Sequence, residues 1–101
     1  MQFIYFLNLT ERLIDDNNWT EKDEKIVSDH FKRLLQMKDN GQLILAGKTS
    51  DRDPVGVVIF NAKNHEEACK IMNDDPAIRK GIMSGELRPY RVALISEENN
   101  S

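Results

Sequence analysis

The sequence predicts an α+β fold in which two helices cover one face of a four-stranded antiparallel sheet. Four stretches rich in aliphatic and aromatic residues have the length of strands. Two further stretches carry apolar residues three and four positions apart, the period of an amphipathic helix. Along the chain these stretches follow the order β-α-β-β-α-β, which is the ferredoxin-like arrangement.

Length and composition limit the classes of protein to consider. A chain of 101 residues fits one domain, and we expect residues 1–101 to form it, with a frayed polar tail at 96–101. The 14 basic residues are scattered and the net charge is −3, which argues against a nucleic-acid partner. The longest apolar run is too short to span a bilayer, and the start lacks the basic region of a signal peptide. We therefore expect a cytoplasmic protein without a membrane partner.

The first strand is expected at residues 3–9, which are apolar on both faces of an extended chain. A polar loop follows at residues 10–19. The first helix should begin after Thr20, a good N-cap, with Asp23 in the place of the capping-box acid. Asn40 and Gly41 should end it near residue 39.

The rest of the chain supplies three strands and a second helix. Residues 42–47 and 55–62 read as strands joined by the polar turn 48–54. The second helix should begin after Asn64, with Glu67 completing a capping box, and should end at residues 74–76. A short helical turn at 76–80 and a last strand at 86–95 follow. Pro89 favours an edge position for that strand because proline lacks an N–H.

The first three strands are apolar on both faces, although a sheet covered on one side should alternate apolar and polar residues. The chain has no further element that would cover the second face. A second copy of the same sheet is the simplest cover. We therefore expect a homodimer that packs sheet to sheet.

His30 is the first candidate functional residue. Ile26, His30 and Leu34 are spaced by four, as are Val27, Phe31 and Leu35, so His30 should lie on the core-facing side of the first helix. It is either a packed core histidine or an acid/base group, since its unperturbed pKa lies near physiological pH.

Asp75 precedes a proline that opens a helical turn, so it is expected to be an N-cap. It is also a carboxylate that could orient His30, because both helices lie on the same face of the predicted sheet. The two roles are compatible, and the sequence does not fix the distance between the residues.

Three other residues are candidates for substrate binding. Arg12 and Trp19 either belong to a solvated loop and a helix start or line a pocket mouth, and Lys48 is either solvated or holds an anionic group. Cys69 is the single cysteine, so neither an intrachain disulfide nor a cysteine metal site is expected. The two histidines are far apart and no phosphate loop is present, so we expect no metal and no cofactor.

Several short segments occur in an order that resembles the YciI-like (YCII-related) family. They are His30-Phe31-Lys32-Arg33-Leu34, Gly41-Gln42-Leu43-Ile44-Leu45-Ala46-Gly47, Glu66-Glu67-Ala68, Asp74-Asp75-Pro76-Ala77-Ile78-Arg79-Lys80-Gly81 and Arg88-Pro89-Tyr90. The resemblance covers nearly the whole chain. Lys48 departs from the family pattern, which often has proline there, and the loop at residues 10–19 is longer than in the shortest members.

The resemblance implies a ferredoxin-like fold that dimerises through its sheets, as in the dimeric α+β barrel superfamily. It also implies that His30 and Asp75 are the recurrent histidine and aspartate of the family and form the catalytic pair. Relatives in the superfamily include cofactor-free monooxygenases, isomerases and a dehydrochlorinase, all acting on small organic molecules. The expectation is a cofactor-independent lyase or isomerase. The alternatives are a non-catalytic metabolite-binding module and a purely structural dimer domain.

Overall fold

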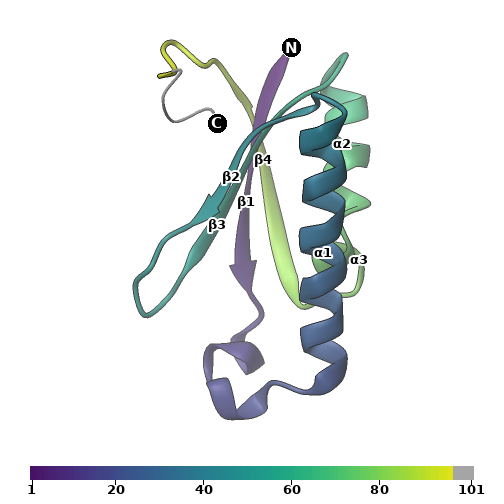
Figure 1. The fold of residues 1–101 in the computed structure, drawn as a ribbon. Coiled ribbons are helices and arrows are strands. Elements are labelled where there is room, and N and C mark those ends of the chain that lie inside the picture. The colour runs from purple at the N-terminus through teal and green to yellow at the C-terminus, as the bar shows by residue number, and fades with distance from the viewer. Residues whose placement is uncertain (97–101) are drawn as a thin grey trace.

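A computed structural model describes residues 1–96 and shows the expected order of strands and helices (Figure 1). The elements are β1 (Gln2–Leu9), η1 (Glu11–Ile14), η2 (Asp16–Asn18), α1 (Glu21–Asp39), β2 (Leu43–Lys48), β3 (Val55–Asn61), α2 (His65–Asn73), α3 (Pro76–Arg79) and β4 (Met83–Tyr90). The short helices η1 and η2 are 3-10 helices in the segment expected to be a loop. Within residues 1–96, no helix is both long enough and apolar enough to cross a membrane.

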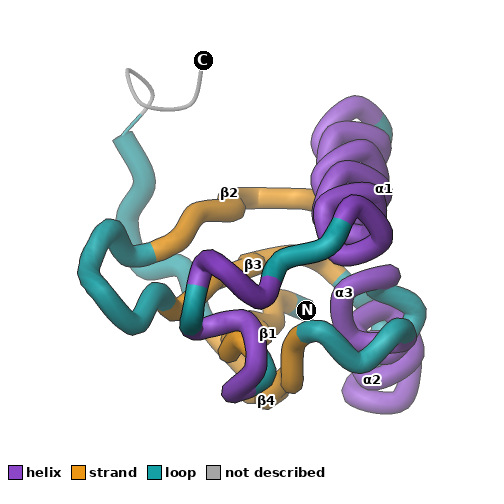
Figure 2. The backbone as a smooth tube through the Cα atoms, turned by 90° about the horizontal axis from the view of Figure 1, so that it is seen from below, coloured by secondary structure: helices purple, strands orange, loops and turns teal. Residues whose placement is uncertain are grey.

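The four strands form one antiparallel sheet in the order β2-β3-β1-β4. The helices α1, α2 and α3 lie together on one side of it, as two perpendicular views show (Figures 1 and 2). This confirms the ferredoxin-like α+β fold. Pro89 lies in β4, which is an edge strand, as its missing N–H predicts.

The helix starts follow the expected capping chemistry. Thr20 and Asp23 form the predicted capping box at the start of α1. At the start of α2, Asn64 accepts a hydrogen bond from the N–H of Glu67 at 2.8 Å. In a complete capping box the Glu67 carboxylate would accept from the N–H of Asn64. Here it accepts from the N–H of Lys63 instead, at 3.4 Å, so the predicted box is only half formed. Gly41 follows α1 with φ of 83°, a conformation that favours glycine.

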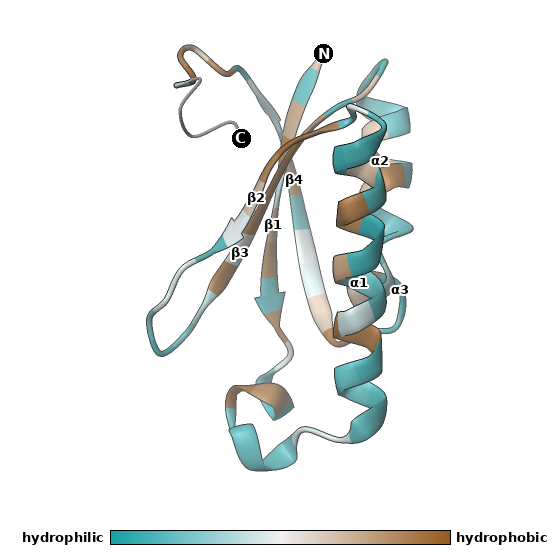
Figure 3. Cartoon of the chain, viewed as in Figure 1, coloured by the Kyte–Doolittle hydropathy of each residue, from teal (hydrophilic) through white to brown (hydrophobic). Residues whose placement is uncertain are grey.

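The core lies between the sheet and the helices. Alternate residues of β1 point into it, namely Phe3, Tyr5 and Leu7, and all three are buried. Their opposite neighbours on β3 include Phe60 and Val58, which are also buried. Figure 3 shows the hydrophobic residues concentrated along β1, β2 and β3, whereas much of α1 consists of hydrophilic residues.

Two boundaries differ from the sequence prediction. The last strand ends at Tyr90 and not at residue 95, because Tyr90 pairs with Gln2 and β1 has no earlier residue in the sheet. Beyond Tyr90, and within residues 1–96, the N–H of Val92 continues the contact with β1 by donating to Gln2 Oε1 at 2.8 Å. The strand also starts earlier, at Met83, so that Gly85 lies inside it rather than in the connection.

The apolar face of α1 is narrower than expected. Ile26 and Leu34 are buried as predicted, but Phe31 is 59% and Leu35 is 44% exposed. A row of residues spaced by four drifts around a helix with 3.6 residues per turn, so two adjacent rows are not buried to the same depth. The row that includes His30 is the more deeply buried of the two.

Candidate functional site

His30 and Asp75 meet in the interior of the fold. The Nδ1 atom of His30 lies 2.7 Å from Oδ1 and 2.9 Å from Oδ2 of Asp75. The side chain of His30 is 12% exposed, and that of Asp75 is 1% exposed. The two residues therefore form a shielded pair in which one ring nitrogen of His30 is fully engaged.

Local structure explains how Asp75 reaches this position. It is the N-cap of α3, and its Oδ1 atom accepts a hydrogen bond from the N–H of Ala77 at 3.0 Å. Pro76 opens α3, where its missing N–H costs nothing. The two roles foreseen for Asp75, a helix cap and a partner of His30, are thus filled by one carboxylate.

Two further side chains surround the same carboxylate. The hydroxyl of Tyr5 donates to Asp75 Oδ2 at 2.6 Å, and Arg33 Nη1 lies 4.0 Å from that oxygen. Burial would raise the pKa of Asp75, but the hydrogen bonds from His30 and Tyr5 outweigh it and hold the pKa below its usual value. Asp75 is therefore an anion at neutral pH.

The ionised carboxylate determines which ring nitrogen of His30 carries the proton. A carboxylate anion only accepts hydrogen bonds, so the Nδ1 atom that contacts it must be a donor. In the neutral imidazole, Nε2 is then unprotonated and can accept a proton. The Nδ1–H tautomer therefore makes His30 Nε2 the atom that can act as a base.

A pocket of about 340 Å³ lies next to this pair, between α1 and the sheet. Its walls are mostly apolar, and it is lined by Leu7, Leu9, Trp19, Val27, His30, Phe31, Leu34, Ala46, Gly47, Lys48, Pro54, Gly56, Val57, Val58 and Met83. Such a cavity has the size of small-molecule sites. Asp75 is not part of the lining, so the pocket reaches the pair through His30.

Trp19 and Lys48, two of the predicted binding residues, also line the pocket. The ring of Trp19 is fixed because its Nε1 donates to the carbonyl of Leu13 at 2.9 Å. Lys48 is exposed and forms no ion pair with any residue of the described segment 1–96. It is the cation at the pocket that is free to meet a ligand.

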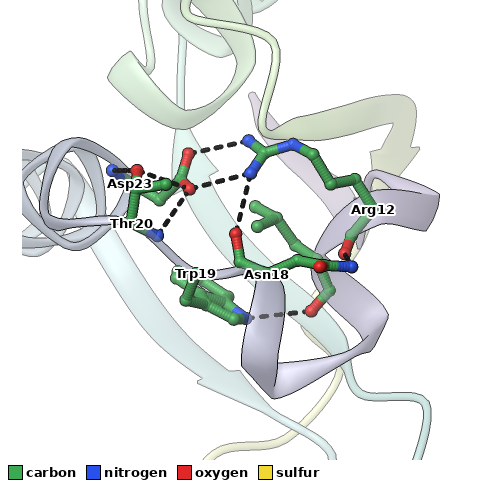
Figure 4. A network of polar contacts seen from close by, with 6 residues as sticks. Arg12, Asn18, Trp19, Thr20 and Asp23 are labelled. Atoms are coloured by element: carbon green, nitrogen blue, oxygen red, sulfur yellow. Dashed lines mark hydrogen bonds and ion pairs between the residues drawn. The ribbon is translucent and has the colours of Figure 1, made fainter.

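Arg12 lies outside the pocket lining, in a network of its own (Figure 4). Its guanidinium donates to both carboxylate oxygens of Asp23, at 2.8 and 3.0 Å, and to the carbonyl of Asn18 at 3.0 Å. The hydrogen bond from Arg12, followed by that from the Thr20 N–H, holds the pKa of Asp23 well below its usual value. Arg12 therefore ties the η1–η2 segment to the start of α1, and we leave it out of the proposed site.

Tyr5 and Arg33 are the polar residues of the site that sequence reasoning did not single out. Each carries a weak signal. Tyr5 places a hydroxyl in the otherwise apolar row Phe3, Tyr5, Leu7, and Arg33 lies three residues after His30, on the same side of a helix. No group of three or more potential metal ligands occurs among residues 1–96.

Fold and site together define a ferredoxin-like α+β protein with a ligand-sized pocket beside a buried histidine–aspartate pair. The chain belongs to the YCII-related domain family, whose model matches residues 1–91. A search of curated proteins gives no significant match. Among solved structures, the chain is similar to the 5-chloro-2-hydroxyhydroquinone dehydrochlorinase from Burkholderia phenoliruptrix, in complex with 2,5-dihydroxybenzoquinone, with a TM-score of 0.69, 14% identity and complete coverage of both chains. At this identity the similarity concerns the fold.

Proposed function

We propose that this protein is a small-molecule enzyme of the lyase or isomerase type, in which His30 transfers a proton. The observation that carries the proposal is the contact of 2.7 Å between His30 Nδ1 and Asp75, with the His30 ring on the wall of the pocket. In the neutral imidazole this contact makes Nε2 the proton acceptor, which supports the assignment of the proton transfer to that atom. The pair acts as the histidine and aspartate of a catalytic triad do, without the nucleophile.

The proposed step needs only proton transfer. Nε2 of His30 takes a proton from a carbon or hydroxyl next to a carbonyl or a phenol ring, and the released electron pair forms a new double bond. In a lyase, a leaving group departs with the electrons of its own bond as the double bond forms, and the proton stays on His30 Nε2. In an isomerase, the imidazolium returns the proton at another position. Asp75 stabilises the imidazolium through the charge-assisted hydrogen bond at Nδ1.

The pocket favours a substrate with an apolar body and one acidic group. Trp19 and Phe31 offer aromatic surfaces, and Lys48 offers a cation without a partner among residues 1–96. A carboxylate or phenolate of the ligand would bind Lys48 while its reacting atom faces His30. Hydroxylated aromatic acids and hydroquinones fit this description, and they form a reasonable first panel for testing.

The experiment incubates this panel with the wild-type protein and follows elimination and isomerisation by mass spectrometry. The His30→Gln variant should lose at least about 100-fold in rate, the usual contribution of a general base. The matched control is His65→Gln, because His65 is the other histidine and is exposed on α2. Equal turnover by His30→Gln and wild type would refute the proposal, and a ligand recovered unchanged would identify a binding module instead.

We further propose that the protein is a homodimer that buries the outer face of its sheet. Alternation along β1 turns Ile4 and Phe6 away from the helices, and their neighbours on β3 are Ile59 and Val57. Phe6 and Val57 are half-buried in the single chain, whereas Ile4 and Ile59 are already buried. Leu45 on β2 extends this apolar surface and is 48% exposed. A sheet face that is meant for water carries polar residues at such positions. A second copy of the same face is a self-complementary cover.

A further inference from the structure

Tyr5 is a buried polar residue that the proposed proton transfer does not use directly. It lies in the middle of β1, its side chain is completely buried, and its ring packs edge-on against Phe60 with centroids 5.6 Å apart. It does not line the pocket. Its hydroxyl nevertheless makes the shortest contact to the Asp75 carboxylate, at 2.6 Å.

The direction of this hydrogen bond follows from the surroundings. Burial, and then the charge and hydrogen bond of Asp75, raise the pKa of Tyr5 above its ordinary value, so that the hydroxyl keeps its proton. The carboxylate of Asp75 has no proton to give. Tyr5 is therefore the donor, and its contact with Asp75 is a charge-assisted hydrogen bond.

Tyr5 has a competitor for the same carboxylate oxygen, Oδ2 of Asp75. Arg33 Nη2 is anchored to the carbonyl of Ile71 at 2.6 Å, which places Nη1 at 4.0 Å from Asp75 Oδ2. This Nη1 atom is buried and has no hydrogen-bond partner among residues 1–96. Because a buried unpaired donor is costly, it attracts any acceptor that can turn toward it. The hydrogen bond from the Tyr5 hydroxyl to Asp75 Oδ2 opposes a rotation of the carboxylate toward Arg33.

We propose that Tyr5 is a positioning residue that holds the Asp75 carboxylate against His30 and away from Arg33, and thereby fixes the imidazole as the Nδ1–H tautomer. Ala77 donates to Oδ1, Tyr5 donates to Oδ2, and His30 Nδ1 lies 2.7 and 2.9 Å from the two oxygens, so these contacts leave the carboxylate a single orientation. The inference rests on the proposed function, because it concerns the orientation of the same base.

The test replaces one hydroxyl. Long-range proton–nitrogen NMR spectra distinguish the two tautomers of His30 in wild type, Tyr5→Phe and Tyr90→Phe. Loss of one hydrogen bond should change the ratio of the tautomers about threefold to tenfold in Tyr5→Phe, in favour of Nε2–H. Tyr90→Phe is the matched control, because Tyr90 is the other tyrosine and is 44% exposed. It should keep the wild-type ratio.

The outcomes separate this inference from the function on which it rests. A folded Tyr5→Phe variant with the wild-type tautomer ratio would overturn the role of Tyr5 and leave His30 as the proposed base. A wild-type protein that carries the proton on Nε2 would overturn both. If Tyr5→Phe does not fold, the unaltered protein still decides, because the Tyr5 hydroxyl proton should exchange slowly and lie close to the His30 Nδ1 proton. A freely exchanging hydroxyl would contradict the proposal.

Discussion

The Nδ1 atom of His30 lies 2.7 Å from Oδ1 of Asp75, although the two residues are 45 positions apart in the sequence. One comes from the middle of α1 and the other caps α3, and both elements cover the same face of the sheet. The carboxylate is ionised, so it orients the imidazole and stabilises its protonated form.

In the Asp75→Asn variant, the free energy of unfolding should change less than in wild type as the pH is lowered into the acid range. The pKa of Asp75 is lowered in the folded state, so its contribution is present above the unfolded pKa of about 3.9 and is lost as the pH falls through the folded pKa. At about pH 7 the variant should be less stable by about 1–3 kcal/mol, the cost of disturbing a buried hydrogen-bonded group.

Urea denaturation of both proteins at about pH 7 and about pH 3 measures this difference. The difference in stability between wild type and Asp75→Asn should narrow at the lower pH, because about pH 3 lies below the unfolded pKa of Asp75 and protonation of the unfolded chain then removes part of the contribution. Asp23 also has a lowered pKa, but it is present in both proteins and affects both curves alike. A gap that stays constant would show that Asp75 is not held as an anion by its neighbours.

Lys48→Gln should weaken the binding of an anionic ligand by about fivefold, which corresponds to roughly 1 kcal/mol for an ion pair near the surface. Isothermal titration calorimetry with a hydroxylated aromatic acid measures the change. Lys38→Gln is the matched control, since Lys38 lies in the last turn of α1 and is not part of the pocket lining. Equal weakening by both variants would point to a general effect of net charge.

Thr20→Ala should destabilise the protein by about 1 kcal/mol and lower Tm by about 4–8 °C, because the N-cap of α1 is lost. The Thr20 hydroxyl accepts from the N–H of Asp23 at 3.2 Å and donates to its carboxylate at 2.9 Å. Thr10→Ala is the control, since the side chain of Thr10 makes no capping hydrogen bond at η1. Calorimetry should find a larger loss at residue 20 than at residue 10, and the reverse order would be inconsistent with the capping box.

Phe6→Glu should convert the proposed homodimer into a monomer, because it places a charge on the outer face of the sheet. Phe6 is only half-buried in the single chain, so the monomer should stay folded. Phe31→Glu introduces the same change on α1, where Phe31 is 59% exposed, and should leave the dimer intact. Sedimentation velocity distinguishes the two states. A wild-type protein that is monomeric at micromolar concentration would contradict the proposed assembly.

The sequence predicted the order of the elements and most helix starts because these depend on local patterns. The capping box at Thr20 and the cap at Asn64 are examples. The end of β4 was not predictable in this way, because β4 ends where Tyr90 pairs with Gln2, the first residue of β1. Helical spacing correctly placed His30 on the buried row, but it could not exclude Phe31 and Leu35 from the core.

The site was predictable only in part, for a similar reason. His30 and Asp75 stood out as individual residues, whereas their contact is a product of tertiary packing. In the sequence, Tyr5 belongs to an apolar strand, and its hydrogen bond to Asp75 is a tertiary contact that the strand pattern does not reveal. Arg12 lies away from the pocket because its guanidinium donates two hydrogen bonds to the Asp23 carboxylate, and the sequence alone does not show this pairing.

The central claim is that the ionised Asp75 carboxylate orients His30 so that, in the neutral imidazole, Nδ1 carries the proton and Nε2 is the proton acceptor. A long-range proton–nitrogen NMR spectrum of the wild-type protein, recorded above the pH at which the imidazole is protonated, tests it most directly. The account predicts that Nδ1 carries the proton and that Nε2 is unprotonated. A His30 imidazole with its proton on Nε2 would contradict it.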